Sequence, residues 1–411
     1  MPTFAEIKKS LLVSVWFIFL TFPIMVIRVN PIEKLIEWRW KNMLYIGIGS
    51  FFFSFLWRYM LQKKERGEKK TDRGEKTGKS VYQWVTESSR RYIPVLAAIA
   101  VVAAIFPFVV STYQTNIMIT ALMYVVLGLG LNIVVGLAGL LDLGYVAFYA
   151  VGAYSYGLLN HHFGLGFWTL LPVGALLGAG FGVLLGFPVL RLRGDYLAIV
   201  TLGFGEIIRL ILENWNAFSF GPSGISGIHR PGLFGIKLSL PQSIIYLYFL
   251  MIGMVLFTIF VVNRLQNSRI GRTWVALRED EIACQAMGID KTRTKLTAFA
   301  LGATWAGMVG VVFAAKTTFI NPASFTFLES AMILAIVVLG GMGSIVGVMI
   351  AAITLILLPE YLRAFSEFRM LIFGAVMVIM MVFRPQGIVA NVRRTYTFRE
   401  KASSPDTTES L

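Results

Sequence analysis

The sequence predicts an all-α polytopic membrane protein, with about 10 to 12 transmembrane or re-entrant helices and both termini in the cytoplasm. Of its 411 residues, 56% are hydrophobic and only 14% are charged, whereas an average soluble domain carries roughly 25% charged residues. Its mean hydropathy is +0.71. Because so few polar side chains cannot cover a soluble protein of this size, we expect much of the surface to face lipid.

Apolar runs along the chain are the candidate spans, since a helix needs about 20 apolar residues to cross the hydrocarbon core. The first run follows Lys8 and Lys9 as in a signal peptide, but no small-residue cleavage site follows it, so we expect a retained helix. The two runs beside residues 340–344 are short and fit either a tight hairpin or a broken, re-entrant pair. In order, the runs are 11–27, 43–57, 92–111, 116–135, 140–159, 167–190, 196–212, 243–262, 296–314, 328–339, 345–358 and 370–383.

Basic residues indicate the orientation of the spans. The chain holds 37 Lys and Arg against 22 Asp and Glu, a net charge of +15. The basic residues gather in segments 58–91 and 264–295 and in the tail from Arg384. Since cytoplasmic loops carry the excess of Lys and Arg in membrane proteins, we place these segments and both termini in the cytoplasm. The basic excess then reflects topology, and no nucleic acid is expected as a partner.

A polar stretch without a hydrophobic core, residues 62–80, is typical of a linker. It divides the chain into a two-helix N-terminal membrane extension (1–60), a basic cytoplasmic linker (61–91), a membrane core (92–390) and a cytoplasmic tail (391–411). On the opposite membrane face, the loop 213–241 is long and rich in Gly, Pro and Ser. This loop either docks an external partner or only connects two spans.

No group of residues predicts catalysis by this chain. The single cysteine, Cys284, excludes an intrachain disulfide and a cysteine-based zinc site, and the histidines lack metal-ligand spacing, so neither a catalytic residue nor a metal is predicted. Residues 74–80 (GEKTGKS) have three residues between their glycines where a phosphate-binding loop needs four. The sequence also lacks the chain of intramembrane acids or histidines that proton-driven transporters use, and the nucleophile of a membrane-embedded enzyme.

Ionisable residues inside spans are costly, which makes Asp142, Glu206 and Arg209 candidates for a pathway or a gate. Glu206 and Arg209 share a helix face, so a purely structural ion pair is the other interpretation. Asp142 follows a predicted helix break and could instead cap the next helix. Glycines at every fourth position form a bare stripe for close packing against a helix of this chain or of a partner. The stripe consists of Gly174, Gly178, Gly182 and Gly186.

A short cytoplasmic helix is predicted over residues 278–287. The acidic residues 279–281 favour its N-terminus because of the helix dipole, and Gly288 is placed to end it. Such a helix between two spans suits insertion into a groove on a partner, so that the two move as one rigid body. Its apolar face, at helical spacing, consists of Ile282, Ala286 and Ile289.

Several long motifs resemble the LivM-type permease subunits of bacterial high-affinity ABC importers for branched-chain amino acids, and the resemblance covers residues 113–390. The N-terminal helices and the charged linker are similar to the extension found on longer members of that family. The motifs are 130–139 (GLNIVVGLAG), 143–149 (LGYVAFY), 193–209 (RGDYLAIVTLGFGEIIR), 276–288 (ALREDEIACQAMG), 338–347 (VLGGMGSIVG) and 383–388 (FRPQGI).

The resemblance implies an ATP-driven importer of leucine, isoleucine and valine in the bacterial inner membrane. This chain would be its non-enzymatic permease and would bind no cofactor itself. Its partners would be a homologous second permease subunit, two ATPase subunits that bind ATP and Mg, and a periplasmic substrate-binding protein. A self-sufficient secondary amino-acid transporter driven by an ion gradient is the alternative.

Under this resemblance, the segment 278–288 is the coupling helix against an ATPase. It departs from the Glu-Ala-Ala pattern of ABC permeases, because Ile282 follows Glu281 and the glycine comes seven positions after the glutamate rather than six. The coupling residues would be Arg278, Glu279, Asp280, Glu281, Ile282, Ala283, Ala286 and Gly288.

Overall fold

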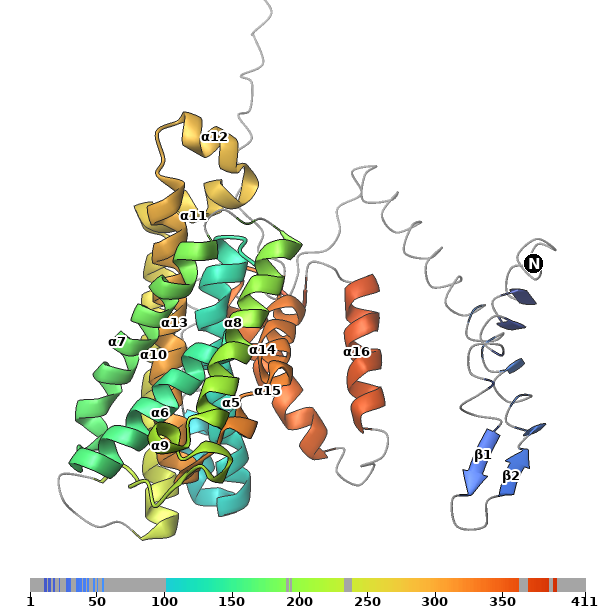
Figure 1. Ribbon diagram of the computed structural model, residues 1–411, viewed down its shortest axis with the longest axis horizontal. Helices are drawn as coiled ribbons and strands as arrows, with labels where there is room; N and C mark the ends of the chain where they lie inside the picture. The colour runs from blue at the N-terminus through green and yellow to red at the C-terminus, as the bar shows by residue number, and fades with distance from the viewer. Residues whose placement is uncertain are drawn as a thin grey trace, which may run out of the picture. The chain divides into compact units, whose positions relative to one another are not determined.

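The computed structural model describes isolated positions between residues 11 and 54, and then residues 101–189, 192, 194–232, 239–361, 369–383 and 387–389. The predicted linker (61–91) and tail (391–411) lie outside the described residues. Two compact units make up the chain, Met1–Leu96 and Ala97–Leu411. Helices dominate the described residues (Figure 1), which confirms the predicted all-α membrane fold.

The N-terminal unit contains a short hairpin. Strand β1 (Ile27–Asn30) pairs antiparallel with β2 (Leu35–Trp38), so that Ile27 lies opposite Trp38. The first predicted span was expected to include Ile27, which instead begins the strand. Helical positions flank the hairpin on both sides, and the Ser14 hydroxyl donates to the Gly47 carbonyl at 2.7 Å. The two predicted N-terminal helices therefore contact each other.

In the core unit, each predicted run from 116–135 onward overlaps a helix, but the helix predicted by the run 140–159 begins only at Val146. Residues 101–109 are also helical. The elements that follow are α5 (Thr112–Leu131), the π-helix η1 (Asn132–Leu137), α6 (Val146–Phe163), α7 (Phe167–Val189), α8 (Asp195–Asn214), α9 (Asn216–Ser219), the 3-10 helix η2 (Gly221–Ser223), β3 (Ile225–Ser226), α10 (Leu240–Gln266), α11 (Arg269–Glu279), α12 (Glu281–Ala286), α13 (Lys291–Thr317), β4 (Phe319–Ile320), the 3-10 helix η3 (Pro322–Ser324), α14 (Phe327–Gly340), α15 (Ile345–Tyr361) and α16 (Arg369–Phe383).

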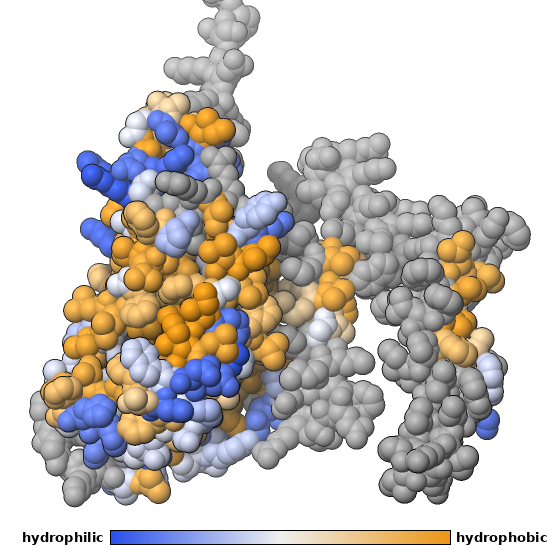
Figure 2. All heavy atoms as spheres, in the orientation of Figure 1, coloured by the Kyte–Doolittle hydropathy of each residue, from blue (hydrophilic) through white to orange (hydrophobic). Residues whose placement is uncertain are grey.

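Five helical segments among the described residues are long and apolar enough to cross a membrane. They are Thr112–Leu137, Phe167–Pro188, Leu240–Gln266, Lys291–Thr317 and Pro322–Gly340. Hydrophobic residues gather over the middle of the core unit, and hydrophilic residues gather around α12 at one end (Figure 2). This distribution is that of a bundle with an apolar belt.

The glycine stripe of α7 faces α13 of the same chain, which answers the question that the sequence left open. A Cβ added at Gly178 would lie 2.6 Å from the Ala303 carbonyl oxygen, and one at Gly182 would lie 2.8 Å from the Phe299 oxygen. Only glycine lets the two backbones approach this closely, and close approach provides the van der Waals contact that joins helices in lipid. Helix α13 also packs on α5 and α6, so it is the central helix of the unit.

Two connections are more ordered than the sequence indicated. The loop predicted over 213–241 contains α9, η2 and β3, and β3 pairs antiparallel with β4 just after α13. Helices α14 and α15 form a tight hairpin, because the N–H of Ser344 donates to the Gly341 carbonyl at 3.0 Å. A Cβ at Gly347 would lie 2.0 Å from the Gly340 oxygen, so glycine is required on both sides of this turn.

Candidate functional site

The segment predicted as one helix over 278–287 is two helices at one end of the core unit (Figure 1). Asp280 separates α11 from α12 and is extended (φ −152°, ψ 111°). Its carboxylate accepts hydrogen bonds from the backbone N–H groups of Ile282 (2.8 Å) and Ala283 (2.9 Å). The prediction of a single helix was wrong because this N-cap satisfies N–H groups that have no intrahelical partner at a helix start.

Two large apolar side chains are exposed on α12 and at its C-cap. Ile282 is 69% exposed and Met287 is 82% exposed, whereas Cys284 on the inner side is 6% exposed. After the helix, Gly288 takes a left-handed φ of 84°, and the N–H of Ile289 donates to the Cys284 carbonyl at 3.0 Å. The short helix is therefore closed at both ends and presents Ile282 and Met287 away from the chain.

Helix α12 is tied to α13 by an ion pair. Glu281 pairs with Lys295, whose side chain is 5% exposed against 15% for the glutamate. One residue before Lys295, the Thr294 carbonyl accepts a hydrogen bond of 3.0 Å from the ring N–H of Trp274, a fully buried residue of α11. These contacts hold α11, α12 and the first turns of α13 together.

Arg278 ties the same helices to the π-helix η1. Its guanidinium donates to the Gly136 carbonyl at 2.6 Å. Its side chain also crosses Gly139, where an added Cβ would lie 2.6 Å from Arg278 Cγ and where φ is 72°. The sequence grouped Arg278 with the residues of the coupling helix, but it belongs to the last turn of α11 and its guanidinium binds this chain.

The π-helix in turn contacts the turn between α14 and α15. Asn132 Oδ1 accepts from the N–H of Gly343 at 2.8 Å, and the Gly343 carbonyl accepts from Gln266 Nε2 at 3.3 Å. A Cβ at Gly136 would lie 2.5 Å from the Gly343 nitrogen. Single-turn π-helices are frequent at functional sites. Here η1 joins α11 to the α14–α15 hairpin and to α10.

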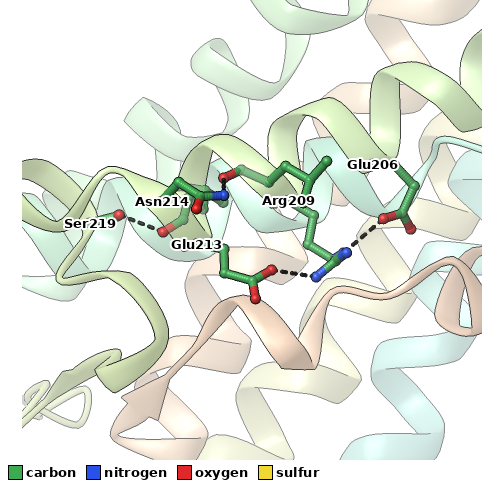
Figure 3. A network of polar contacts seen from close by, with 7 residues as sticks. Glu206, Arg209, Glu213, Asn214 and Ser219 are labelled. Carbon is green, nitrogen blue, oxygen red and sulfur yellow. Dashed lines mark hydrogen bonds and ion pairs between the residues drawn. The ribbon is translucent and has the colours of Figure 1, made fainter.

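A charged network lies along α8 (Figure 3). Arg209 bonds Glu206 at 2.8 Å and Glu213 at 2.7 Å, and the three side chains are 24%, 33% and 39% exposed respectively. Beyond it, the Ser219 hydroxyl donates to the Leu212 carbonyl at 2.6 Å and closes the end of the helix. Sequence reasoning missed Glu213 because the predicted span ended at residue 212. The arrangement is compatible with an ion pair that stabilises α8 and with a charged lining of a pathway.

Asp142 is fully buried in the segment between η1 and α6. Its Oδ1 accepts from the N–H of Gly144 at 2.9 Å, whereas the N-cap of α6 is Tyr145, which makes no side-chain cap bond. The capping interpretation was wrong, because the carboxylate closes a local turn of the Asx type instead. The N–H of Leu143 donates to the Thr201 hydroxyl at 3.0 Å, which holds this segment against α8.

Comparison with known proteins identifies the family. The family model described as the permease component of the branched-chain amino acid transport system matches residues 113–381. The chain belongs to this permease family. The permease is 46% identical over 378 residues to the high-affinity branched-chain amino acid transport system permease proteins LivM of Salmonella typhimurium and of Escherichia coli, with 87% of each chain covered. It is 23% identical over 285 residues to the permease protein LivH of Escherichia coli, covering 65% of this chain and 91% of LivH. No solved structure matches it.

The structure of this permease also shows charged residues that the sequence analysis did not single out. Tyr124 of α5 donates a hydrogen bond to Glu329 of α14, and Lys316 of α13 donates one to Thr120 of α5. Glu329 falls inside the predicted run 328–339, which was the signal that could have found it. Lys316 lies two residues beyond a predicted run, where a basic residue is ordinarily attributed to the flank of a span.

Proposed function

We propose that this chain is the transmembrane permease subunit of an ATP-driven importer that moves leucine, isoleucine and valine from the periplasm to the cytoplasm. The family match and the names of its relatives support this function. The apolar spans support a multi-pass position in the bacterial inner membrane. Both termini are cytoplasmic in this proposal, because the basic segments lie on one side of the spans.

The partners follow from the same proposal. Similarity to both LivM and LivH supports a second, homologous permease subunit beside this one. Two ATPase subunits hold ATP and Mg, and a periplasmic binding protein captures the substrate. The segment 213–241 is the candidate docking surface for that protein, and its pairing through β3 with β4 gives it a direct connection to α13.

The observation that carries the mechanism is the position of α12, which is exposed on its apolar side and tied on the other. Ile282 and Met287 face away from the chain, and Glu281 pairs with the buried Lys295 of α13. A partner ATPase that binds this face and moves would pull α13 through the ion pair and η1 through Arg278. Since α13 packs on α5, α6 and α7, a shift of its end would move the helices at the centre of the bundle.

Reconstitution tests the proposal. Vesicles with ATP inside, and with binding protein and labelled leucine outside, should accumulate leucine only when this chain, the second permease and both ATPases are all present. The secondary-transporter alternative expects accumulation by this chain alone under a proton or sodium gradient. Gradient-driven accumulation without partners would refute the proposed function.

The pathway or gating role of Asp142, Glu206 and Arg209 is a separate proposal. A gating role for the α8 network predicts that Arg209→Gln changes leucine uptake while the amount of assembled complex stays normal. A purely structural ion pair predicts that uptake falls only in step with the amount of complex.

A further inference from the structure

Two oppositely charged side chains reach the same helix, α5, from two different neighbours. Lys316, in the last turn of α13, donates to the Thr120 hydroxyl. Glu329, in the first turn of α14, accepts from the Tyr124 hydroxyl. Thr120 and Tyr124 are four residues apart on α5, so their Cβ atoms lie about 5–6 Å apart on one face. The hydroxyl groups that hold the two charges therefore come from neighbouring turns of α5.

These charges lie within spans, where ionisable groups are expensive and usually pair with one another. Tyr124, the partner of Glu329, stands in the middle of the span Thr112–Leu137. Yet in the part of the chain that the structure describes, no ion pair joins Lys316 to Glu329, and the recorded partner of each is a hydroxyl. Both side chains are half-buried. Two opposite charges that do not pair with each other match a ligand that carries both charges.

An aromatic cluster adjoins the two charges. Phe313 precedes Lys316 by three residues on α13 and so shares its face. Its ring centroid lies 5.3 Å from that of Tyr149 on α6 and 5.8 Å from that of Phe325. The ring centroid of Tyr149 also lies 5.3 Å from that of Phe325. Tyr149 and Phe325 are buried, so the half-buried Phe313 supplies the apolar surface beside Lys316.

We propose that Lys316, Glu329 and this aromatic cluster form a binding site for a zwitterionic amino acid with an apolar side chain. Lys316 binds the carboxylate, Glu329 binds the ammonium group, and the side chain of the ligand packs against Phe313. Coulomb attraction between ions is strong where the dielectric constant is low, so each charged group prefers an ionic ligand group to a neutral hydroxyl. The inference rests on the proposed function, because it gives the imported substrate a place in this subunit.

The test uses the complete transporter in vesicles, with Lys316→Met and Glu329→Gln. Losing one hydrogen bond to a charged group lowers binding about ten- to hundredfold, and we expect ATP-driven leucine uptake to fall by that factor. Stimulation of ATP hydrolysis by the leucine-loaded binding protein should persist, because coupling does not use these residues. Glu360→Gln is the matched control, since Glu360 also accepts from a tyrosine of α5, Tyr113, and it should leave uptake unchanged.

A charge exchange separates binding from structure. A zwitterion binds either way round, so combining Lys316→Glu with Glu329→Lys should recover part of the uptake that each single exchange removes. Normal uptake by Lys316→Met and Glu329→Gln overturns the site. So does uptake that falls only in proportion to the yield of assembled complex, with no recovery in the double exchange. Failure of the unaltered transporter to import leucine would instead refute the proposed function itself, and the site with it.

Discussion

Glu281→Gln tests whether the ion pair between Glu281 and Lys295 transmits movement of α12 to α13. The substitution removes the charge that faces Lys295, whose side chain is only 5% exposed. Breaking a buried ion pair by removing one partner costs about 3–5 kcal/mol, because the other charge stays buried without compensation. Helix α12 is short, with bounds Glu281–Ala286. In the variant we therefore expect α12 to detach from α13, because water then reaches the charge of Lys295 and little other structure is lost. At 1.4 kcal/mol for each factor of ten, the undocked population should rise about a hundred- to several-thousandfold.

Cys284 reports this release directly. It is the single cysteine of the chain and is 6% exposed on the inner side of α12, so a maleimide reaches it only when the helix undocks. Glu281→Gln should accelerate its labelling. Leucine uptake and stimulated ATP hydrolysis should each fall at least about tenfold, which corresponds to a coupling free energy reduced by about 1.4 kcal/mol. Capture of leucine by the separate binding protein should not change.

Two further variants show whether the ion pair is the cause. Replacing both partners, Glu281→Met with Lys295→Met, should restore docking, because an apolar pair of similar size is often neutral or stabilising where a buried ion pair stood. Arg293→Gln breaks the exposed pair with Asp290, whose side chains are 87% and 53% exposed. Such a surface pair contributes about 0–1 kcal/mol, so labelling should stay slow. Slow labelling and normal coupled uptake in Glu281→Gln would refute the reasoning.

The remaining predictions concern glycines and a helix cap. Gly178→Val should lower the thermal stability of the detergent-solubilised chain, because its Cβ would lie 2.6 Å from the Ala303 oxygen and overpacking costs about 1–3 kcal/mol. Gly180→Val, where no atom lies within 4 Å, is its control, and equal melting temperatures would contradict the packing. Asp280→Ala should weaken the start of α12 by about 1 kcal/mol and moderately speed the same maleimide labelling; unchanged labelling would count against the cap. Gly139→Ala should impair coupled uptake, since its φ is 72° and its Cβ would strike Arg278, and wild-type uptake would show that this contact is dispensable.

Much of the fold could be read from the sequence because lipid imposes a simple rule on it. In the hydrocarbon core every backbone polar group must be satisfied within the chain, so a long apolar run becomes a helix whatever surrounds it. For this reason the runs from 116–135 onward overlap helices, and the glycine stripe on α7 was recognisable as a packing surface. The exposed short helix before α13 was also recognisable, because its acids, its apolar face and Gly288 are all local features.

Side-chain contacts between distant segments were decided only by the tertiary structure. Nothing local distinguishes Arg278 from a residue that faces a partner, since its acceptor, Gly136, is 142 positions away. Lys316 and Glu329 likewise become a pair of sites only because α13 and α14 bring them to one face of α5. Composition and periodicity decide which segments cross the bilayer, whereas electrostatic partnership depends on distances between helices, which a linear pattern does not contain.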